Sequence, residues 1–405
     1  MKKLLKISLV ASLVLGSVNV VADEVKVANS VEDMFSNGNV SGQIRLGYYD
    51  VDATQDTYAT AIGGQLKYET ASLSGISLGA AVYTSHSISS LSGSNNKYSD
   101  FLASSKKSYT ELAEAYINYS YEGLNLRAGR QLIDTPLADS DDIAMTPHTF
   151  EAYVASYTLK DLGLTLIGAN VQRWQGTDAD YENSTLNSWK DTGDNSTWMA
   201  AALYKNDMFE TGVWYYDVEK SAKAVYADVT APIAVGENQE VTLGAQYLTE
   251  SESSNSGVDG SIAGVMAESS FLGANVMLAY DRVSVNDGKQ IFEGFGGGSS
   301  YTNMNTMTAG NLHDGTHGDG SSYLASLGYE VSSVNLSVAY GDYKADAIGA
   351  GAKAHVSELD IGLTYAYNDG KADLTVMYAV GTDKESSVRT SYDDDSLQVT
   401  INYNF

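Results

Sequence analysis

The chain has 405 residues, contains no cysteine and carries a formal net charge of −27. Disulfide bonds and thiol chemistry are therefore excluded, and the acidic balance argues against a nucleic-acid partner, whose phosphates would be repelled. The counts of 29 Tyr, 38 Gly and only 3 Pro favour many strands with loose connections. Tyrosine in particular favours a membrane–water interface, where its ring meets lipid and its hydroxyl meets water.

The N-terminus has the layout of a cleavable secretory signal. Three lysines lie among the first six residues, an apolar stretch covers 7–18, and small residues precede Asp23. This order of basic, apolar and small residues is typical of exported proteins, and the apolar stretch is too short to span a membrane comfortably as a helix. We expect residues 1–22 to be removed and residues 23–405 to form a single domain.

Segments in which apolar and polar residues alternate recur from about residue 40 onward. Successive side chains of a strand point to opposite faces, so each segment has one apolar and one polar face. Each is about as long as the roughly 9–11 residues that a tilted strand needs to cross a bilayer. We predict about eighteen strands, near 40–50, 58–71, 75–86, 109–121, 123–132, 147–160, 162–174, 197–205, 207–217, 222–231, 239–250, 258–268, 270–282, 322–330, 332–343, 355–367, 370–381 and 395–405.

The connections between these segments alternate in length. Short links such as 121–123, 205–207 and 368–371 are rich in Gly, Asn and Asp, which suit tight hairpins. The alternate links are mostly longer, at about 87–108, 133–146, 175–196, 283–321, 344–354 and 382–394. Short turns at one end and long loops at the other are typical of bacterial outer-membrane barrels. The predicted fold is an all-β, transmembrane, antiparallel up-and-down β-barrel of about 18 strands, wide enough to leave an aqueous channel.

The last predicted strand, 395–405, has to pair with the first, 40–50, because lipid offers no partner to the backbone groups of an open sheet edge. Leu397, Val399 and Ile401 place its apolar face toward lipid, as does Phe405 at the end of the chain. A terminal aromatic residue on the lipid face resembles the signal by which outer-membrane barrels are recognised for assembly.

The phase of the alternation assigns charged side chains to the lumen. Arg45, Lys67 and Arg127 are each flanked by outward-facing apolar residues, and together they form a candidate basic wall. Ala113 and Ala115 are expected to face outward, which places Glu114 inward. The alternative is that these polar residues simply occupy the wet face without a special role.

Residues 127–153 carry a resemblance to a known family. The Gly-Arg-Gln at 129–131, the Asp-Thr-Pro at 134–136 and the Met-Thr-Pro-x-Thr-Phe-Glu at 145–151 resemble the OprD-type outer-membrane porins, and the major porins of epsilonproteobacteria are similar. The resemblance implies passive diffusion of ions and small hydrophilic solutes, with no catalytic residue and a location in the bacterial outer membrane.

The resemblance also implies that the third external loop, 133–146 here, folds inward and narrows the pore, and that arginines at positions 127 and 130 line one wall. Arg130 departs from simple alternation, which places it at a bulge or at the rim. A field between an acidic loop and a basic wall would then select ions. The predicted constriction consists of Asp134, Asp139, Asp141, Asp142, Arg45, Lys67, Glu114, Arg127 and Arg130.

Other functions remain open from the sequence. A structural or adhesin barrel without a channel is the main alternative, and a barrel hydrolase using Asp139, Ser140 and His148 is a weaker one, because no nucleophile elbow accompanies these residues. A secreted β-solenoid would show a fixed short repeat, and none is present.

The sequence makes weaker predictions about metals and partners. The Gly- and Ser-rich segment 294–322, with its paired histidines, favours a solvated loop over a metal site. Asp139, Asp141 and Asp142 are weak Ca²⁺ candidates, since Ca²⁺ prefers oxygen ligands, and no other cofactor is expected. Net acidity predicts weak cation preference. Outer-membrane lipid and lipopolysaccharide are expected partners, and similarity to porins implies a homotrimer.

Overall fold

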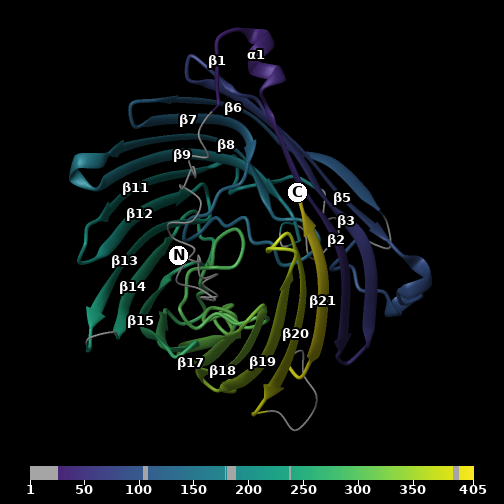
Figure 1. Cartoon of the computed structure of the whole chain (residues 1–405). Coiled ribbons are helices and arrows are strands. Elements are labelled where there is room, and N and C mark those ends of the chain that lie inside the picture. The colour runs from purple at the N-terminus through teal and green to yellow at the C-terminus, as the bar shows by residue number, and fades with distance from the viewer. Residues whose placement is uncertain (1–25, 104–107, 178, 180–187, 237–238, 386–391) are drawn as a thin grey trace.

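The chain forms a closed β-barrel in the computed structural model, which describes residues 26–103, 108–177, 179, 188–236, 239–385 and 392–405. The predicted signal at 1–22 lies outside the described residues. None of the helices within these ranges is long and apolar enough to cross a membrane. Figure 1 shows the strands as a ring, with loop segments crossing the space that the ring encloses.

The barrel wall has eighteen antiparallel strands, which confirms the predicted fold. They are β2 (Asn39–Asp52), β3 (Thr57–Glu69), β5 (Ile76–Ser87), β6 (Tyr109–Tyr121), β7 (Leu124–Gln131), β8 (Thr149–Leu159), β9 (Leu164–Gln175), β11 (Thr197–Lys205), β12 (Glu210–Val218), β13 (Ala222–Ala234), β14 (Glu240–Glu252), β15 (Gly260–Phe271), β16 (Ala274–Val285), β17 (His317–Val331), β18 (Val334–Ala347), β19 (Ala354–Tyr367), β20 (Ala372–Asp383) and β21 (Asp395–Asn404). Each overlaps one predicted segment.

Among the residues that the structure describes, seven short elements lie outside this wall. They are β1 (Val27–Ala28), β4 (Ser72–Leu73), β10 (Lys190–Asp191), the helix α1 (Val31–Ser36) and the 3₁₀ turns Ser89–Leu91, Asn95–Lys97 and Lys160–Leu162. The side chain of Ser30 caps α1 by accepting a hydrogen bond from the backbone N–H of Asp33. Because β1 pairs in parallel with β4 in the link between β3 and β5, α1 lies at the end of the barrel that has the short turns.

The barrel closes between its first and last wall strands. β2 and β21 pair from Gln43↔Asn404 to Asp52↔Asp395. Beyond this ladder, the backbone N–H of Gly42 donates to the carbonyl of Phe405 at 3.0 Å, and the N–H of Phe405 donates back to the carbonyl of Gly42 at 3.0 Å. The backbone N–H and carbonyl groups of the two edge strands therefore hydrogen-bond to each other, as a lipid environment requires.

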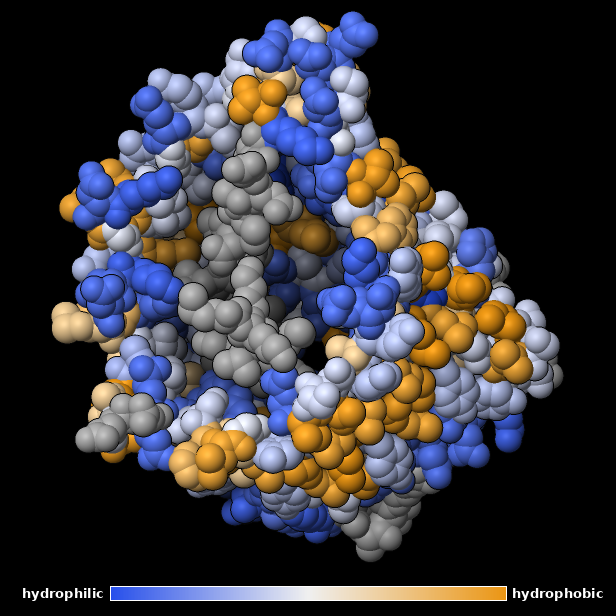
Figure 2. All heavy atoms as spheres, in the orientation of Figure 1, coloured by the Kyte–Doolittle hydropathy of each residue, from blue (hydrophilic) through white to orange (hydrophobic). Residues whose placement is uncertain are grey.

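The outer wall is apolar and the inner wall is mixed. Ile44 and Leu46 are exposed on the outside of β2, whereas Arg45 between them is buried. Figure 2 shows apolar side chains gathered on the outer wall in the right half of the view, over β2–β5, β20 and β21. The alternation that the sequence predicted is therefore the alternation between lipid-facing and inward-facing side chains.

One predicted orientation is wrong, because β6 contains an irregularity that the alternation could not show. The register against β5 shifts between Ala81 and Val82, so that Glu114 faces Ala81 while Leu112 faces Val82. Ala113 is the extra residue, and it is fully buried instead of facing outward. Such a bulge adds one residue, so the alternation reverses across it: Thr110 and Leu112 are exposed before the bulge, whereas Tyr116 and Asn118 are buried after it. Glu114 faces inward as predicted, at 1% exposure.

The closing seam gives a testable prediction. A Cβ on Gly42 would lie 2.5 Å from the carbonyl oxygen of Gln65 and 2.7 Å from the ring of Phe405. Gly42→Val should therefore cost about 1–3 kcal/mol through overpacking and reduce the yield of folded barrel, measured by heat-dependent mobility on a denaturing gel. Gly168→Val is the control, because nothing lies within 4 Å of a Cβ there. Equal yields for the two variants would contradict the geometry of the seam.

Candidate pore constriction

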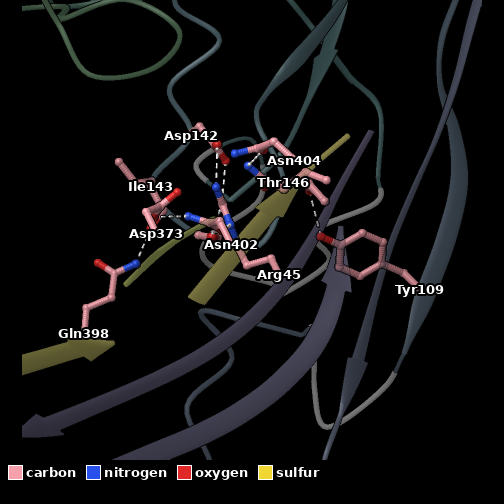
Figure 3. A network of polar contacts seen from close by, with 11 residues as sticks. Arg45, Tyr109, Asp142, Ile143, Thr146, Asp373, Gln398, Asn402 and Asn404 are labelled. Carbon is pink, nitrogen blue, oxygen red and sulfur yellow. Dashed lines mark hydrogen bonds and ion pairs between the residues drawn. The ribbon is translucent and has the colours of Figure 1, made fainter. Parts of the chain in front are cut away.

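The loop between β7 and β8, residues 132–148, is tied to the inner wall by one arginine. Nη1 and Nη2 of Arg45 donate to the two carboxylate oxygens of Asp142 at 2.7 and 2.8 Å. Nη1 also donates to the carbonyl of Ala144 at 2.7 Å, and Nε donates to Asn402 on β21 at 2.8 Å. A planar guanidinium that pairs two oxygens of one carboxylate fixes direction as well as distance. The loop is thereby held against β2 and β21 (Figure 3).

Further contacts fasten the same loop along its length. Gln398 on β21 donates to the carbonyl of Ile143 at 2.6 Å, and the hydroxyls of Tyr109 and Thr146 lie 2.8 Å apart. At the other end of the loop, the backbone N–H of Leu137 donates to the hydroxyl of Tyr216 on β12 at 3.4 Å. The loop therefore contacts inward-facing side chains from well-separated strands of the barrel.

A second loop, residues 286–316 between β16 and β17, is also buried against the inner wall. Thr302 is 0% exposed, and Leu312 and Met307 are buried in a cluster with wall residues. The prediction of a solvated loop over 294–322 is therefore wrong. Its Ser, Thr and Asn residues do not keep the loop in solvent. Their hydroxyl and amide groups instead lie against an inner wall that carries carboxylates.

The second loop is held mainly by carboxylates that project from wall strands. The backbone N–H and the hydroxyl of Thr302 both donate to Asp281 on β16 at 2.8 Å. Thr306 makes the same pair of bonds with Glu358 on β19, also at 2.8 Å. The oxygens of these carboxyl groups accept hydrogen bonds from backbone N–H groups of the loop that have no partner on a neighbouring strand. Two further carboxylates accept backbone N–H bonds: Glu250 from Phe292 at 2.9 Å and Asp360 from Asn305 at 3.1 Å.

The two loops meet each other. The N–H of Asp139 donates to the carbonyl of Phe295 at 2.9 Å, and the N–H of Phe295 donates to the carbonyl of Leu137 at 3.0 Å. Gly294 and Gly296 flank this bridge with φ values of 95° and 106°, and a Cβ at either would lie within 2.6 Å of a backbone oxygen of the first loop. Glycine is therefore required on both sides of the junction.

An apolar cluster consolidates the junction. Phe295 packs edge-on against Trp174 of β9 with ring centroids 5.4 Å apart, and Phe292 lies 5.2 Å from Phe295. The same cluster contains Leu137 from the first loop and Trp214 from β12. Burial of these large rings is the main apolar contribution to holding both loops in place.

Two of the three predicted wall bases are paired with carboxylates. Lys67 on β3 donates to Glu114 at 3.0 Å and lies 3.9 Å from Glu69. Tyr83 donates to the second oxygen of Glu114 at 2.9 Å. Arg45 is paired with Asp142, as described. The wall formed by β2, β3 and β6 is thus close to charge balance.

Arg127 and Arg130 on β7 have different surroundings. Arg127 donates to Asn118 at 3.1 Å and stacks over the ring of Tyr116 at 4.4 Å, and both of these partners are neutral. The ladders of β7 with β6 and β8 run through Gly129 without a register shift, so Arg130 projects from the face of the strand opposite to that of Arg127. It lies 3.6 Å from Glu151 of β8. The structure therefore does not bring Arg130 together with Arg45 or Lys67.

The remaining predicted residues lie within the first loop. Asp134 accepts a hydrogen bond from the N–H of Ser140 at 3.0 Å, and Asp139 accepts one from the N–H of Asp141 at 3.0 Å. Burial, together with the charge of Asp134, raises the pKa of Asp139 to about 7. Asp134 and Asp139 thus accept hydrogen bonds from the loop backbone, whereas Asp142 bonds to the predicted wall base Arg45.

The arrangement does not assemble the hydrolase triad. The Ser140 hydroxyl donates to the carbonyl of Ile133 and accepts from its N–H, both at 2.9 Å. The Nδ1 of His148 lies 3.3 Å from the backbone oxygen of Asp139. Within the described ranges, no group of three or more His, Cys, Asp or Glu could hold a metal ion, so the Ca²⁺ prediction gains no support from the geometry.

Sequence reasoning missed the contacts of the second loop with the inner wall. Its contact residues are Phe292, Phe295, Thr302, Asn305 and Thr306, and its wall partners are Glu250, Asp281, Glu358 and Asp360. Inward-facing carboxylates on β14, β16 and β19, together with a long loop rich in Ser, Thr and Asn donors, are a signal that could have located it.

The Arg45 contacts give a second prediction. Arg45→Gln should destabilise the attachment of the first loop by about 1.5–3 kcal/mol, the usual contribution of a hydrogen bond to a charged group, and should speed amide hydrogen exchange at residues 140–148. Arg282→Gln is the control, because it removes an exposed 3.2 Å pair with Asp319 that does not involve this loop. Unchanged exchange in the Arg45 variant would show that the loop is held by other contacts.

The buried Asp139 gives a third prediction. Its pKa of about 7 is raised from 3.8, so the folded loop binds the proton more tightly than the unfolded chain. Its contribution to stability is fully present below about pH 4 and is lost as pH rises through 7. The melting temperature of Asp139→Asn, which mimics the protonated form, should rise relative to that of the parent protein between pH 4 and 8. A pH-independent difference would contradict the assigned burial.

Comparison with known proteins agrees with the barrel fold. Residues 70–405 match the family model described as outer membrane porin, OprD family, whereas none of the curated proteins matches the chain. Among solved structures, OpdK of Pseudomonas aeruginosa has a TM-score of 0.78 at 17% identity, covering 92% of this chain and 99% of its own. OccAB3 of Acinetobacter baumannii has a TM-score of 0.77 at 13% identity, covering 91% and 99%. The chain belongs to the OprD family of outer-membrane porins, which pass small solutes across that membrane.

Proposed function

We propose that the loops 132–148 and 286–316 together narrow the water-filled lumen of this porin, and that the narrowed pore prefers small cations. The observation that supports the first part is the direct bridge between the loops at Ala138 and Phe295, combined with their attachment to different parts of the wall. A lumen of 18 strands is too wide for wall side chains alone to fill, so the loops set its width.

The proposed cation preference follows from an uneven distribution of charge on the inner wall. By the alternation, the inner faces of β12–β21, all within the described ranges, carry no Lys or Arg. They carry the carboxylates Asp228, Glu250, Glu268, Asp281, Glu358, Asp360 and Asp373. On β2 and β3, Arg45 and Lys67 are paired with carboxylates. Arg127 on β7, by contrast, contacts the neutral side chains of Asn118 and Tyr116. Unbalanced carboxylates attract cations and repel anions in a confined pore.

The remaining expectations are part of the same proposal. Passage is passive, and no residue of the chain acts as a catalyst. We carry the homotrimer, lipopolysaccharide contact and Ca²⁺ on Asp139, Asp141 and Asp142 forward as predictions. Ca²⁺ has the weakest support, because Asp142 is engaged with Arg45.

A planar bilayer experiment tests the proposal. The refolded protein should show discrete open steps and, under a KCl gradient, a reversal potential with the sign of cation preference. Arg127→Gln should increase that preference, because it removes the wall base that contacts neutral groups. A reversal potential with the sign of anion preference would overturn the charge argument while keeping the channel. A folded barrel without open steps would overturn the proposed passage and favour a structural barrel.

A further inference from the structure

A small group of basic side chains lies on the outer wall of the barrel, at the end with the long loops. Lys344 lies near the end of β18, His355 near the start of β19, and Lys384 directly after β20. All three surround Asp342, and we call Asp342, Lys344, His355 and Lys384 the rim lysine patch. None of these residues takes part in the constriction.

The strand alternation places this patch on the lipid side. Its neighbours Tyr343 and Ala345 are buried on the inner face, whereas Tyr340 is exposed on the outer face. The ladder pairs Tyr340 with Leu359 and Lys344 with His355. The exposed apolar band of Val338, Tyr340 and Leu359 therefore ends where the charged positions begin, which is the level of a lipid headgroup.

The charge of the patch is positive. The carboxylate of Asp342 accepts from His355 Nε2 at 2.8 Å and from Lys384 Nζ at 3.1 Å, and it lies 3.2 Å from Lys344 Nζ. One carboxylate thus faces two ammonium groups and an imidazole, and half of the Lys344 side chain remains exposed. Lys384 also donates to the hydroxyl of Tyr340 at 2.8 Å, which holds its ammonium close to the wall.

This positive charge is local. The chain has 24 basic and 51 acidic residues, and the outward positions at the same end of the neighbouring strands β2 and β21 are Asp50, Asp52 and Asp395. A general attraction to anions is therefore absent, and a ligand at this place has to present its negative charge to the patch itself. The outer leaflet of this membrane presents phosphate groups on lipid A, at the height of the patch.

We propose that the rim lysine patch binds a phosphate group of lipid A in the outer leaflet. Lys344 and Lys384 donate to the phosphate oxygens, Asp342 keeps the two ammonium groups together, and the apolar band below contacts the acyl chains. Basic clusters at a membrane surface recognise anionic headgroups in this way. This inference rests on the outer-membrane location of the family and does not depend on ion selectivity.

The test uses the full chain refolded in detergent and titrated with bisphosphorylated lipid A, dephosphorylated lipid A or inorganic phosphate, with binding followed by native mass spectrometry. Lys344→Gln combined with Lys384→Gln should weaken binding of bisphosphorylated lipid A about 25-fold, from roughly 5-fold per lysine. Binding of dephosphorylated lipid A should not change. Replacing both lysines by Arg should retain most of the affinity.

Lys223→Gln is the matched control. Lys223 is an exposed lysine at the same end of β13, facing outward opposite Asp217, and its loss should leave binding unchanged. Unaltered channel conductance would show that the variants are folded. Equal binding by the double Gln variant and the parent protein, or equal binding of both lipid forms by the parent, would overturn the proposal. Inorganic phosphate binding as tightly as lipid A would assign the patch to free anions instead.

Discussion

The structure depends on the absence of hydrogen-bond partners in lipid. Every backbone N–H and carbonyl of a membrane-spanning strand needs a neighbouring strand, so the sheet must close on itself. Here the closure runs from the β2–β21 ladder to the paired Gly42 and Phe405. A closed ring of eighteen strands is wider than wall side chains can fill, and this width is what permits two long loops to enter.

Loops inside a barrel face the same requirement in another form, because their backbone groups are buried without a strand partner. In this chain the inner wall supplies the partners. Asp281 and Glu358 accept from Thr302 and Thr306, while Arg45 donates to Asp142 and to a loop carbonyl. The same carboxylates that anchor the second loop also make one side of the inner wall acidic. Loop attachment and the proposed ion preference therefore have a common origin.

The fold could be predicted from the sequence because lipid on one side and water on the other impose a period of two on every wall strand. The placement of Arg45 and Glu114 on the inner face followed from the same period. The inward orientation of Ala113 could not be predicted, because a bulge shifts the register of a strand without leaving a mark in its composition. The second loop escaped prediction because its small polar residues suit water and carboxylate partners equally well. Only the fold shows which partner is present.

The direct bridge between the two loops is the central claim, and a cysteine pair tests it. The chain has no cysteine of its own, so Ala138→Cys with Phe295→Cys would be the sole thiols, at positions paired in the bridge; a disulfide forms only between residues whose Cα atoms lie close together. Mild oxidation of the folded barrel should join them, and conductance should be the same before and after oxidation. Thiols that stay free, or a conductance that changes sharply on oxidation, would show that the loops are apart in the open pore.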